Sequence, residues 1–161
     1  MLLRALLAFL ALPGVVAFAV PLLIAATDPV RGAIVLPGVA VVLVGCALLL
    51  WCVRDFYVAG KGTLAPWDPP RRLVVVGLYR HVRNPMYVAV LTLVAGWAIV
   101  FASWRLAVYV AFLAVAFHVR VVWHEEPWLA AQFGETWRRY RAHVRRWWPR
   151  LQPWTDESTT P

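Results

Sequence analysis

Four long apolar stretches, separated by polar segments, are the main feature of the sequence. They cover about residues 3–26, 33–53, 85–102 and 104–123. Each has close to the roughly 20 apolar residues that a helix needs to cross a hydrocarbon core of about 30 Å. Because only short polar segments join the first stretch to the second and the third to the fourth, the pattern predicts two antiparallel helical hairpins.

A different pattern follows Pro127. Apolar residues recur there at steps of three and four, which places them on one face of a helix: Leu129, Phe133, Trp137, Tyr140, Val144, Trp148 and Leu151. We therefore predict an amphipathic helix over about residues 127–148, lying in the membrane interface or folded back under the bundle. The polar ending, residues 155–161, is predicted to be disordered.

Together these elements predict one domain over residues 1–154, an all-α integral membrane protein with four transmembrane helices and a C-terminal amphipathic interfacial helix. The composition agrees, because 62% of the residues are hydrophobic and only 15% are charged, which excludes the class of ordinary soluble domains. The first stretch also has features of a secretory signal, since Arg4 lies at its start and an apolar run follows. Its apolar run continues beyond the small residues Ala17 and Ala19, so we expect an uncleaved span.

The positive charge is concentrated on one side of the predicted hairpins. The net charge is +8, and basic residues lie between the second and third stretches and after the fourth: Arg54, Lys61, Arg71, Arg72, Arg80, Arg83, Arg138, Arg139, Arg141, Arg145, Arg146 and Arg150. The positive-inside rule predicts a multi-pass protein of the cytoplasmic (inner) membrane, with both termini and the central loop in the cytoplasm. Lipid phosphates account for these arginines without a nucleic-acid partner. Cys46 and Cys52 lack the spacing of a metal site or a disulfide framework, so we expect no metal.

Residues that suit a binding or catalytic site gather around Pro85, at the start of the third stretch. They are Gly77, Tyr79, Arg83, Asn84 and Tyr87. Proline suits the first turn of a helix, and a helix start presents backbone N–H groups and the positive end of the helix dipole. We therefore expect this end, at the cytoplasmic interface, to bind a carboxylate or phosphate group.

Two adjacent glutamates, Glu125 and Glu126, follow directly after the fourth stretch. Like charges repel, and the C-terminal end of a helix disfavours anions, so a positive group should meet them. Two interpretations stay open. Arg83 or Arg120 forms an ion pair that closes the bundle, or one glutamate binds a cationic group of a ligand. His124, beside them, is either an interfacial histidine or a catalytic one.

The string LVVVGLYRHVRNPMYV, followed after a hairpin by HEEPWLAAQFGETWRRYRAHVRRWWPRL, resembles membrane methyltransferases. The similar group contains the isoprenylcysteine carboxyl methyltransferases and the phospholipid methyltransferases. Its pattern is a Gly-x-Tyr segment, Arg-His-Pro-x-Tyr, a Glu-Glu pair and a Phe-Gly segment with tyrosines, and the match covers about residues 73–151. The resemblance implies methyl transfer from S-adenosylmethionine to a lipophilic acceptor from the bilayer, an isoprenylcysteine-like carboxylate or a phospholipid amine.

The resemblance also implies which residues line the site. For S-adenosylmethionine binding it points to Arg71, Arg72, Leu73, Val74, Tyr79, Arg83, Asn84, Pro85, Tyr87, Glu125 and Glu126. Among them, Arg83, Asn84 and Glu126 are expected to take part in catalysis.

Asn84 departs from the family pattern, because it stands where the family has histidine. It keeps hydrogen bonding but cannot titrate. For an amine acceptor, the candidate bases are therefore Glu126, His81 and His124. Two other interpretations stay open: a sterol-reductase-like membrane reductase that binds NADPH, and a non-catalytic membrane scaffold protein.

Overall fold

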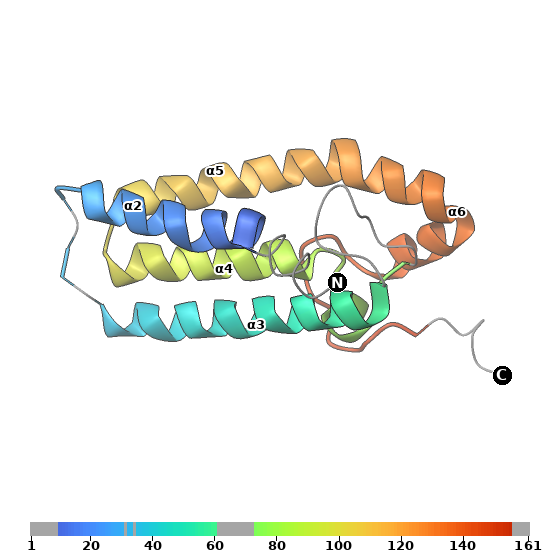
Figure 1. Cartoon of the computed structure of the whole chain (residues 1–161). Helices are drawn as coiled ribbons and strands as arrows, with labels where there is room; N and C mark the ends of the chain where they lie inside the picture. Colours follow the sequence, from blue (N-terminus) through green and yellow to red (C-terminus); the bar gives the residue numbers. More distant parts are fainter. Residues whose placement is uncertain (1–9, 31, 34, 61–72, 156–161) are drawn as a thin grey trace.

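The computed structural model describes residues 10–30, 32–33, 35–60 and 73–155, and all regular elements in this part of the chain are helical (Figure 1). They are η1 (Leu10–Ala19), α2 (Val20–Thr27), α3 (Leu36–Gly60), η2 (Gly77–Arg80), α4 (Pro85–Val100), α5 (Trp104–Arg120), η3 (Val121–Glu125) and α6 (Glu126–His143). Helices α2 to α5 form one elongated bundle, and α6 folds at one end of it. The predicted all-α class is confirmed for these residues, and most of the expected polar tail, residues 156–161, lies outside them.

Two described helices are long and apolar enough to cross a membrane by length and composition: Leu36–Asp55 and Trp104–His143. Helix Pro85–Val100 has 16 residues, which extend about 24 Å at 1.5 Å per residue, less than a hydrocarbon core of about 30 Å. The apolar helix Pro13–Thr27 is also shorter, and the beginning of the first expected span lies outside the described residues. The expectation of four full-length spans is therefore corrected to two long apolar helices and two shorter ones.

Helix α4 is short because it has signals that limit it at both ends. Pro85 stands in its first turn, where the missing N–H leaves no hydrogen bond unmade. After the helix ends, Ala102 adopts a left-handed φ of 45°. Ser103 then caps α5, because its hydroxyl accepts a hydrogen bond from the Leu106 N–H at 3.4 Å.

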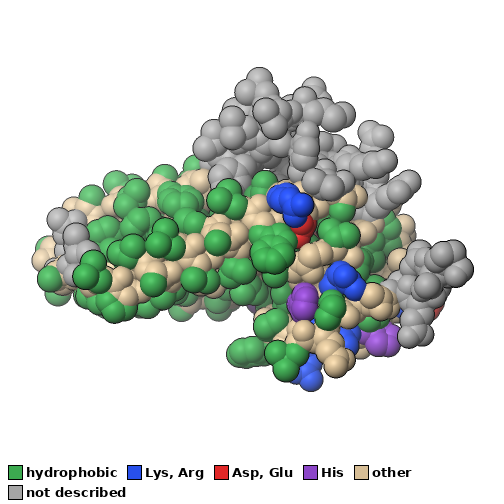
Figure 2. Space-filling view, turned by 90° about the horizontal axis from the view of Figure 1, so that it is seen from below, with side chains coloured by type: hydrophobic (Ala, Val, Ile, Leu, Met, Phe, Trp, Pro, Cys, Tyr) green, Lys and Arg blue, Asp and Glu red, His purple; other side chains and the backbone are tan. Residues whose placement is uncertain are grey.

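The sides of the bundle expose large apolar side chains. Leu43 of α3 and Phe112 of α5 are examples. Figure 2 shows hydrophobic side chains along the bundle, with Lys, Arg and His side chains gathered toward one end. An apolar surface of this kind indicates apolar surroundings. Together with the two long apolar helices, it indicates membrane association.

Helices α3 and α4 approach each other closely at glycines. A Cβ atom at Gly45 of α3 would lie 2.7 Å from the Cα atom of Leu93, and one at Gly96 of α4 would lie 2.7 Å from the backbone N of Val42. Small residues at such positions let helix backbones pack against each other directly. This packing sets the end of α3 beside the start of α4, where the polar residues gather.

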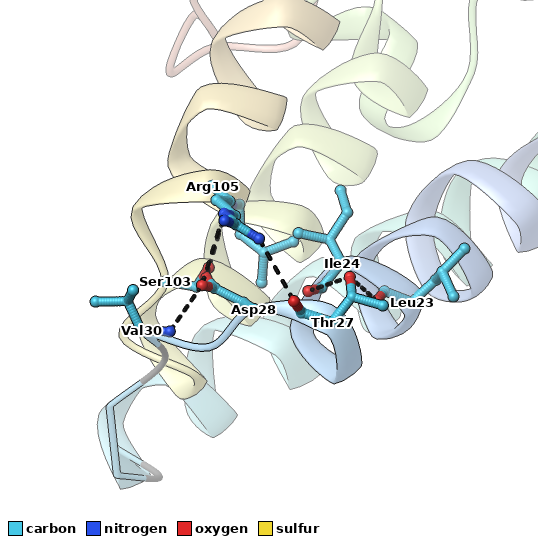
Figure 3. Close-up of polar contacts among 8 residues, drawn as sticks. Leu23, Ile24, Thr27, Asp28, Val30, Ser103 and Arg105 are labelled. Carbon is cyan, nitrogen blue, oxygen red and sulfur yellow. Dashed lines mark hydrogen bonds and ion pairs between the residues drawn. The ribbon is translucent and has the colours of Figure 1, made fainter.

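A buried carboxylate fastens the opposite end of the bundle (Figure 3). Asp28, in the loop after α2, accepts hydrogen bonds from the Ser103 hydroxyl and, at 3.1 Å, from the Val30 N–H. Arg105 Nε lies 3.7 Å from the same carboxylate. Because Ser103 caps α5 and Arg105 lies in its first turn, this cluster ties the loop between α2 and α3 to the second hairpin.

Helix α6 is shorter than the amphipathic helix predicted over residues 127–148. It kinks at Gly134, where φ is 49°, and ends at His143. Val144 is extended, and residues 145–154 contain no further helix. The kink needs a left-handed φ, which glycine adopts at little cost. The helical period of the apolar residues carries no information about such a break, so the prediction of one helix as far as residue 148 was wrong.

Part of the apolar side of α6 packs against the segment that precedes α4. Trp137 and Tyr140 are buried and pack with Leu73 and Val75 from the segment before α4. This part of the stripe therefore faces the segment before α4, and the choice between the two predicted placements stays a prediction. Trp148, further along the predicted stripe, is exposed instead.

Replacing Gly45 by leucine is expected to lower the thermal stability of the chain. The new side chain would meet the backbone of α4, and overpacking of this kind costs about 1–3 kcal/mol. Thermal unfolding of detergent-purified variants measures the effect. The matched control is Ala47→Leu, at an exposed position of the same helix. Equal unfolding temperatures for the two variants would contradict the close packing of α3 and α4.

Asp28→Ala is expected to destabilise the chain more than Arg105→Gln does. Removing the carboxylate leaves the Ser103 hydroxyl and the Val30 N–H without their acceptor, at a cost of about 1–3 kcal/mol. Arg105 is exposed, so loss of its ion pair costs less than about 1 kcal/mol. Thermal unfolding compares the two variants. A larger effect of Arg105→Gln would show that the ion pair, rather than the hydrogen bonds, holds this cluster together.

Candidate functional site

Two segments that are distant in the sequence meet at the charged end of the bundle (Figure 1). One is the connector, residues 73–84, which precedes α4, and the other is the C-terminal segment, residues 144–154, which follows α6. The Arg83 N–H donates to the Arg145 carbonyl at 2.9 Å, and two further backbone hydrogen bonds of 2.9 and 3.0 Å join the segments. The start of α4 is thereby held next to the C-terminal segment.

Glu126, at the start of α6, is held between two arginines. Arg146 donates to both of its carboxylate oxygens, at 2.6 and 2.9 Å, and Arg83 Nη1 lies 3.0 Å from Oε1. The side chains of Glu126 and Arg83 are each only 8% exposed. Several charged donors around a buried carboxylate stabilise its ionised form.

The protonation state of this cluster follows from its geometry. Burial by itself would raise the pKa of Glu126, but the hydrogen bond from Arg146 and the charges of Arg83 and Arg146 outweigh burial and hold the pKa below its usual value. Burial lowers the pKa of Arg83, and the charge of Glu126 opposes that shift. The hydrogen bond to Glu126 raises the pKa of Arg146. At neutral pH the cluster is one carboxylate between two guanidinium ions.

The neighbouring Glu125 has a different set of partners. Its carboxylate accepts hydrogen bonds from the Tyr87 hydroxyl and, at 2.9 Å, from Arg120 Nε. The two glutamates stand at the junction of α6 with the π-helical turn η3, which joins it to α5. Turns of this kind interrupt the regular helical register and occur frequently at functional sites.

Both ion pairs of the first interpretation are therefore present, Arg83–Glu126 and Arg120–Glu125. Binding of a ligand cation by either glutamate stays a prediction. A ligand at Glu126 would have to compete with two arginines. Glu125 is more open, because its side chain is 27% exposed.

Asn84 precedes α4 but makes no capping hydrogen bond with its side chain. Its Nδ2 instead donates to the Arg146 carbonyl at 3.2 Å. The Asn84 amide thus helps to hold the C-terminal segment against the start of α4. Its predicted part in catalysis stays a prediction.

The remaining residues of the implied cofactor set lie in apolar surroundings. Val74 and Tyr79 are buried with Cys52 of α3, Leu73 packs against the buried side of α6, and Pro85 is buried. Two further members of the set lie outside the described residues: Arg71 and Arg72. Within the described part of the chain, no group of three His, Cys, Asp or Glu side chains is placed to hold a metal ion.

The three candidate bases differ in their surroundings. Glu126 is held by two arginines. His81 Nδ1 lies 2.8 Å from the Arg150 carbonyl oxygen, and since a carbonyl only accepts, this nitrogen carries a proton. His124 is exposed on η3.

One acidic residue at this end of the bundle was not identified from the sequence. Asp55, near the end of α3, has a side chain that is only 8% exposed. Its Oδ2 has no hydrogen-bond partner among the described residues. Gly77 of the connector comes directly against it, because a Cβ atom there would lie 1.9 Å from Oδ2. The signal in the sequence is an aspartate at the end of an apolar stretch, since ionisable residues at such depth are candidates for function.

A comparison with family models gives a match that covers most of these residues. The model described as phospholipid methyltransferase matches residues 33–136, more than half of the 161-residue chain. The matched range contains α3, the connector, α4, α5 and both glutamates. No curated protein and no solved structure gave a match.

Replacing Glu126 by glutamine is expected to destabilise the chain by about 3 kcal/mol at neutral pH, because two arginines then face a neutral amide. The pKa of Glu126 is lowered in the folded chain, from a usual value of 4.5. Its contribution is therefore complete above about pH 4.5 and is lost as the pH falls through the lower folded-state pKa. Thermal unfolding of both proteins from pH 7 downward should show the difference shrinking below about pH 4.5.

The control for this experiment is Glu135→Gln on α6. The Glu135 carboxylate is exposed and lies 3.5 Å from Arg138, so its loss should cost less than about 1 kcal/mol. If Glu126→Gln behaved like this control, or if its effect did not change with pH, the buried ion pairs would not contribute to stability as described.

Proposed function

The chain belongs to the phospholipid methyltransferase family, and from this premise we propose that it transfers a methyl group from S-adenosylmethionine to a lipophilic acceptor in a membrane. Membership of this family implies methyltransferase activity in general. The observation that supports the finer proposal is a set of charged residues, among them Arg83, Glu126 and Asp55 with buried side chains, at one end of a bundle with apolar sides, within the matched range. A polar cofactor and an apolar acceptor would meet at such an end.

Arg83 fits the carboxylate of the cofactor's amino-acid part. Its Nε is buried and has no hydrogen-bond partner among the described residues, and an unsatisfied donor of this kind is costly unless a ligand completes it. The Trp137 ring, whose centroid lies 5.5 Å from Arg83 Cζ, helps to fix the guanidinium group. The positive end of α4 adds to the attraction for an anion. When bound, S-adenosylmethionine supplies an electrophilic methyl group.

The cofactor's amino group requires an acceptor, for which the resemblance offers Glu125 or Glu126. Glu125 is the better candidate, because it is partly exposed and held by one arginine and one tyrosine. Glu126 is buried between two arginines, and we assign it the role of positioning Arg83.

Methyl transfer at this site would depend chiefly on alignment of the acceptor in a region shielded from water. A carboxylate acceptor needs no base, whereas an ammonium must first lose a proton. Glu126 is a poor base, because two arginines stabilise its ionised form and hold its pKa low. The exposed apolar sides of the bundle would let a lipid acceptor approach from the bilayer.

The charged end of the bundle would face the cytoplasm. Most of the arginines lie in the sequence segments around and after the residues that form this end. The positive-inside rule therefore supports a cytoplasmic position for it. In this arrangement the four apolar helices lie in the membrane, and both termini and the site are cytoplasmic. The two shorter helices are then accommodated by local thinning of the bilayer.

The detergent-purified protein is expected to bind S-adenosylmethionine and S-adenosylhomocysteine, and not NADPH, in parallel calorimetric titrations. Arg83→Lys keeps the charge opposite Glu126 but loses the planar guanidinium, and it should weaken both interactions about tenfold, the effect of one charge-assisted hydrogen bond. The control Arg138→Lys changes an exposed residue of α6 and should leave both affinities unchanged.

Binding of NADPH alone would overturn the methyltransferase proposal in favour of a membrane reductase. If the folded protein in lipid nanodiscs bound none of the three compounds, a non-catalytic scaffold would replace the enzyme as the best interpretation.

A further inference from the structure

Asp55 is a buried acid that its described surroundings do not satisfy. Its Oδ2 has no hydrogen-bond partner among the described residues. Its Oδ1 lies 3.5 Å from Nη1 of Arg54, whose side chain is 75% exposed, so this pair compensates little. Withdrawing a carboxylate from water without partners is unfavourable. A bound cation would remove this penalty.

The connector is packed directly onto this carboxylate. Gly77 approaches so closely that a Cβ atom there would overlap Oδ2, and its φ of 51° is one that glycine adopts readily. Cys52 lies one helical turn before Asp55 and packs with Val74 and Tyr79 of the connector. Asp55 therefore borders the residues for which the resemblance implies cofactor binding.

The two glutamates at the same end both have hydrogen-bond partners among the described residues. Glu126 binds two arginines, and Glu125 binds Arg120 and the Tyr87 hydroxyl. Of these three acids, Asp55 alone has an oxygen atom that is buried and without a hydrogen-bond partner in the described part of the chain.

Tyr79 of the connector is buried beside Cys52, one helical turn from Asp55. Burial raises the pKa of its hydroxyl well above the usual value, and the charges of Asp55 and Glu125 are among the further causes. An alkylammonium group has three N–H donors, so it can bind more than one carboxylate at once.

We propose that the Asp55 carboxylate binds the alkylammonium group of a ligand, with Gly77 leaving room for the carboxylate. The inference rests on the proposed methyltransferase function. Two ligands of that reaction carry such a group: the amino-acid part of S-adenosylmethionine, and the headgroup of an amine acceptor lipid.

The decisive variant is Asp55→Asn, which keeps the shape of the side chain and removes its charge. Because the unliganded chain is relieved of an unsatisfied buried carboxylate, its unfolding temperature should equal or exceed that of the wild type. The control is Arg54→Gln, which changes the exposed neighbour and should leave ligand affinities unchanged.

Calorimetry with two probes distinguishes the source of the ammonium group. S-adenosylhomocysteine carries the amino group, and 5′-methylthioadenosine lacks the whole amino-acid part. If Asp55 binds the cofactor, Asp55→Asn should weaken the first interaction about tenfold or more and leave the second unchanged, as expected for one charge-assisted contact. If Asp55 binds the acceptor, both affinities stay the same and the KM for phosphatidylethanolamine in nanodiscs rises about tenfold.

Three results would overturn the inference. Unchanged affinities with an unchanged KM would show that Asp55 touches neither ligand. A lowered unfolding temperature with equal weakening of both probes would show a structural role. Absence of S-adenosylhomocysteine binding to the wild-type protein would overturn the methyltransferase proposal itself, a failure that is visible before any variant is measured.

Discussion

The charged end of the molecule depends on one shared carboxylate, that of Glu126. Arg83 precedes α4, Glu126 begins α6 and Arg146 lies in the C-terminal segment, so a single ionic cluster joins three parts that no common helix connects. A buried ion is costly unless it is paired and hydrogen-bonded. The three segments are therefore held in one relative position. The hydrogen bond of Asn84 to the C-terminal segment adds to the same junction.

The buried acids in the described part of the chain fall into two kinds. Asp28 and Glu126 have several donors each and fasten the two ends of the bundle. Asp55 has a buried oxygen without a partner in the described residues, next to the connector. A satisfied buried acid stabilises the fold, whereas an unsatisfied one lowers stability and is suited to bind a ligand. This contrast separates the residues that build the site from the one that we propose acts within it.

Much of the fold could be predicted from local pattern. Apolar stretches with turn residues between them predicted the helices, and Pro85 marked the start of α4 as expected. The burial of Trp137 and Tyr140 on one side of α6 also followed from their spacing. Helix lengths were harder to predict from the sequence. Ala102, Ser103 and Gly134 set where helices end, begin or kink through backbone conformation and capping, which hydrophobic periodicity does not encode.

For the site, the sequence by itself determined which chemical groups are available: two adjacent glutamates, an arginine before a helix start, and an asparagine where the family has histidine. Only the tertiary structure decided their partners. Glu125 and Glu126 are neighbours in the chain yet bind different arginines, because each lies against different segments. The close contact between Gly77 and the Asp55 carboxylate is a tertiary contact, so only the structure identified Asp55 as part of this end. The physical reason is that pairing and desolvation depend on which distant segments come together, and a pattern along one chain records only neighbours.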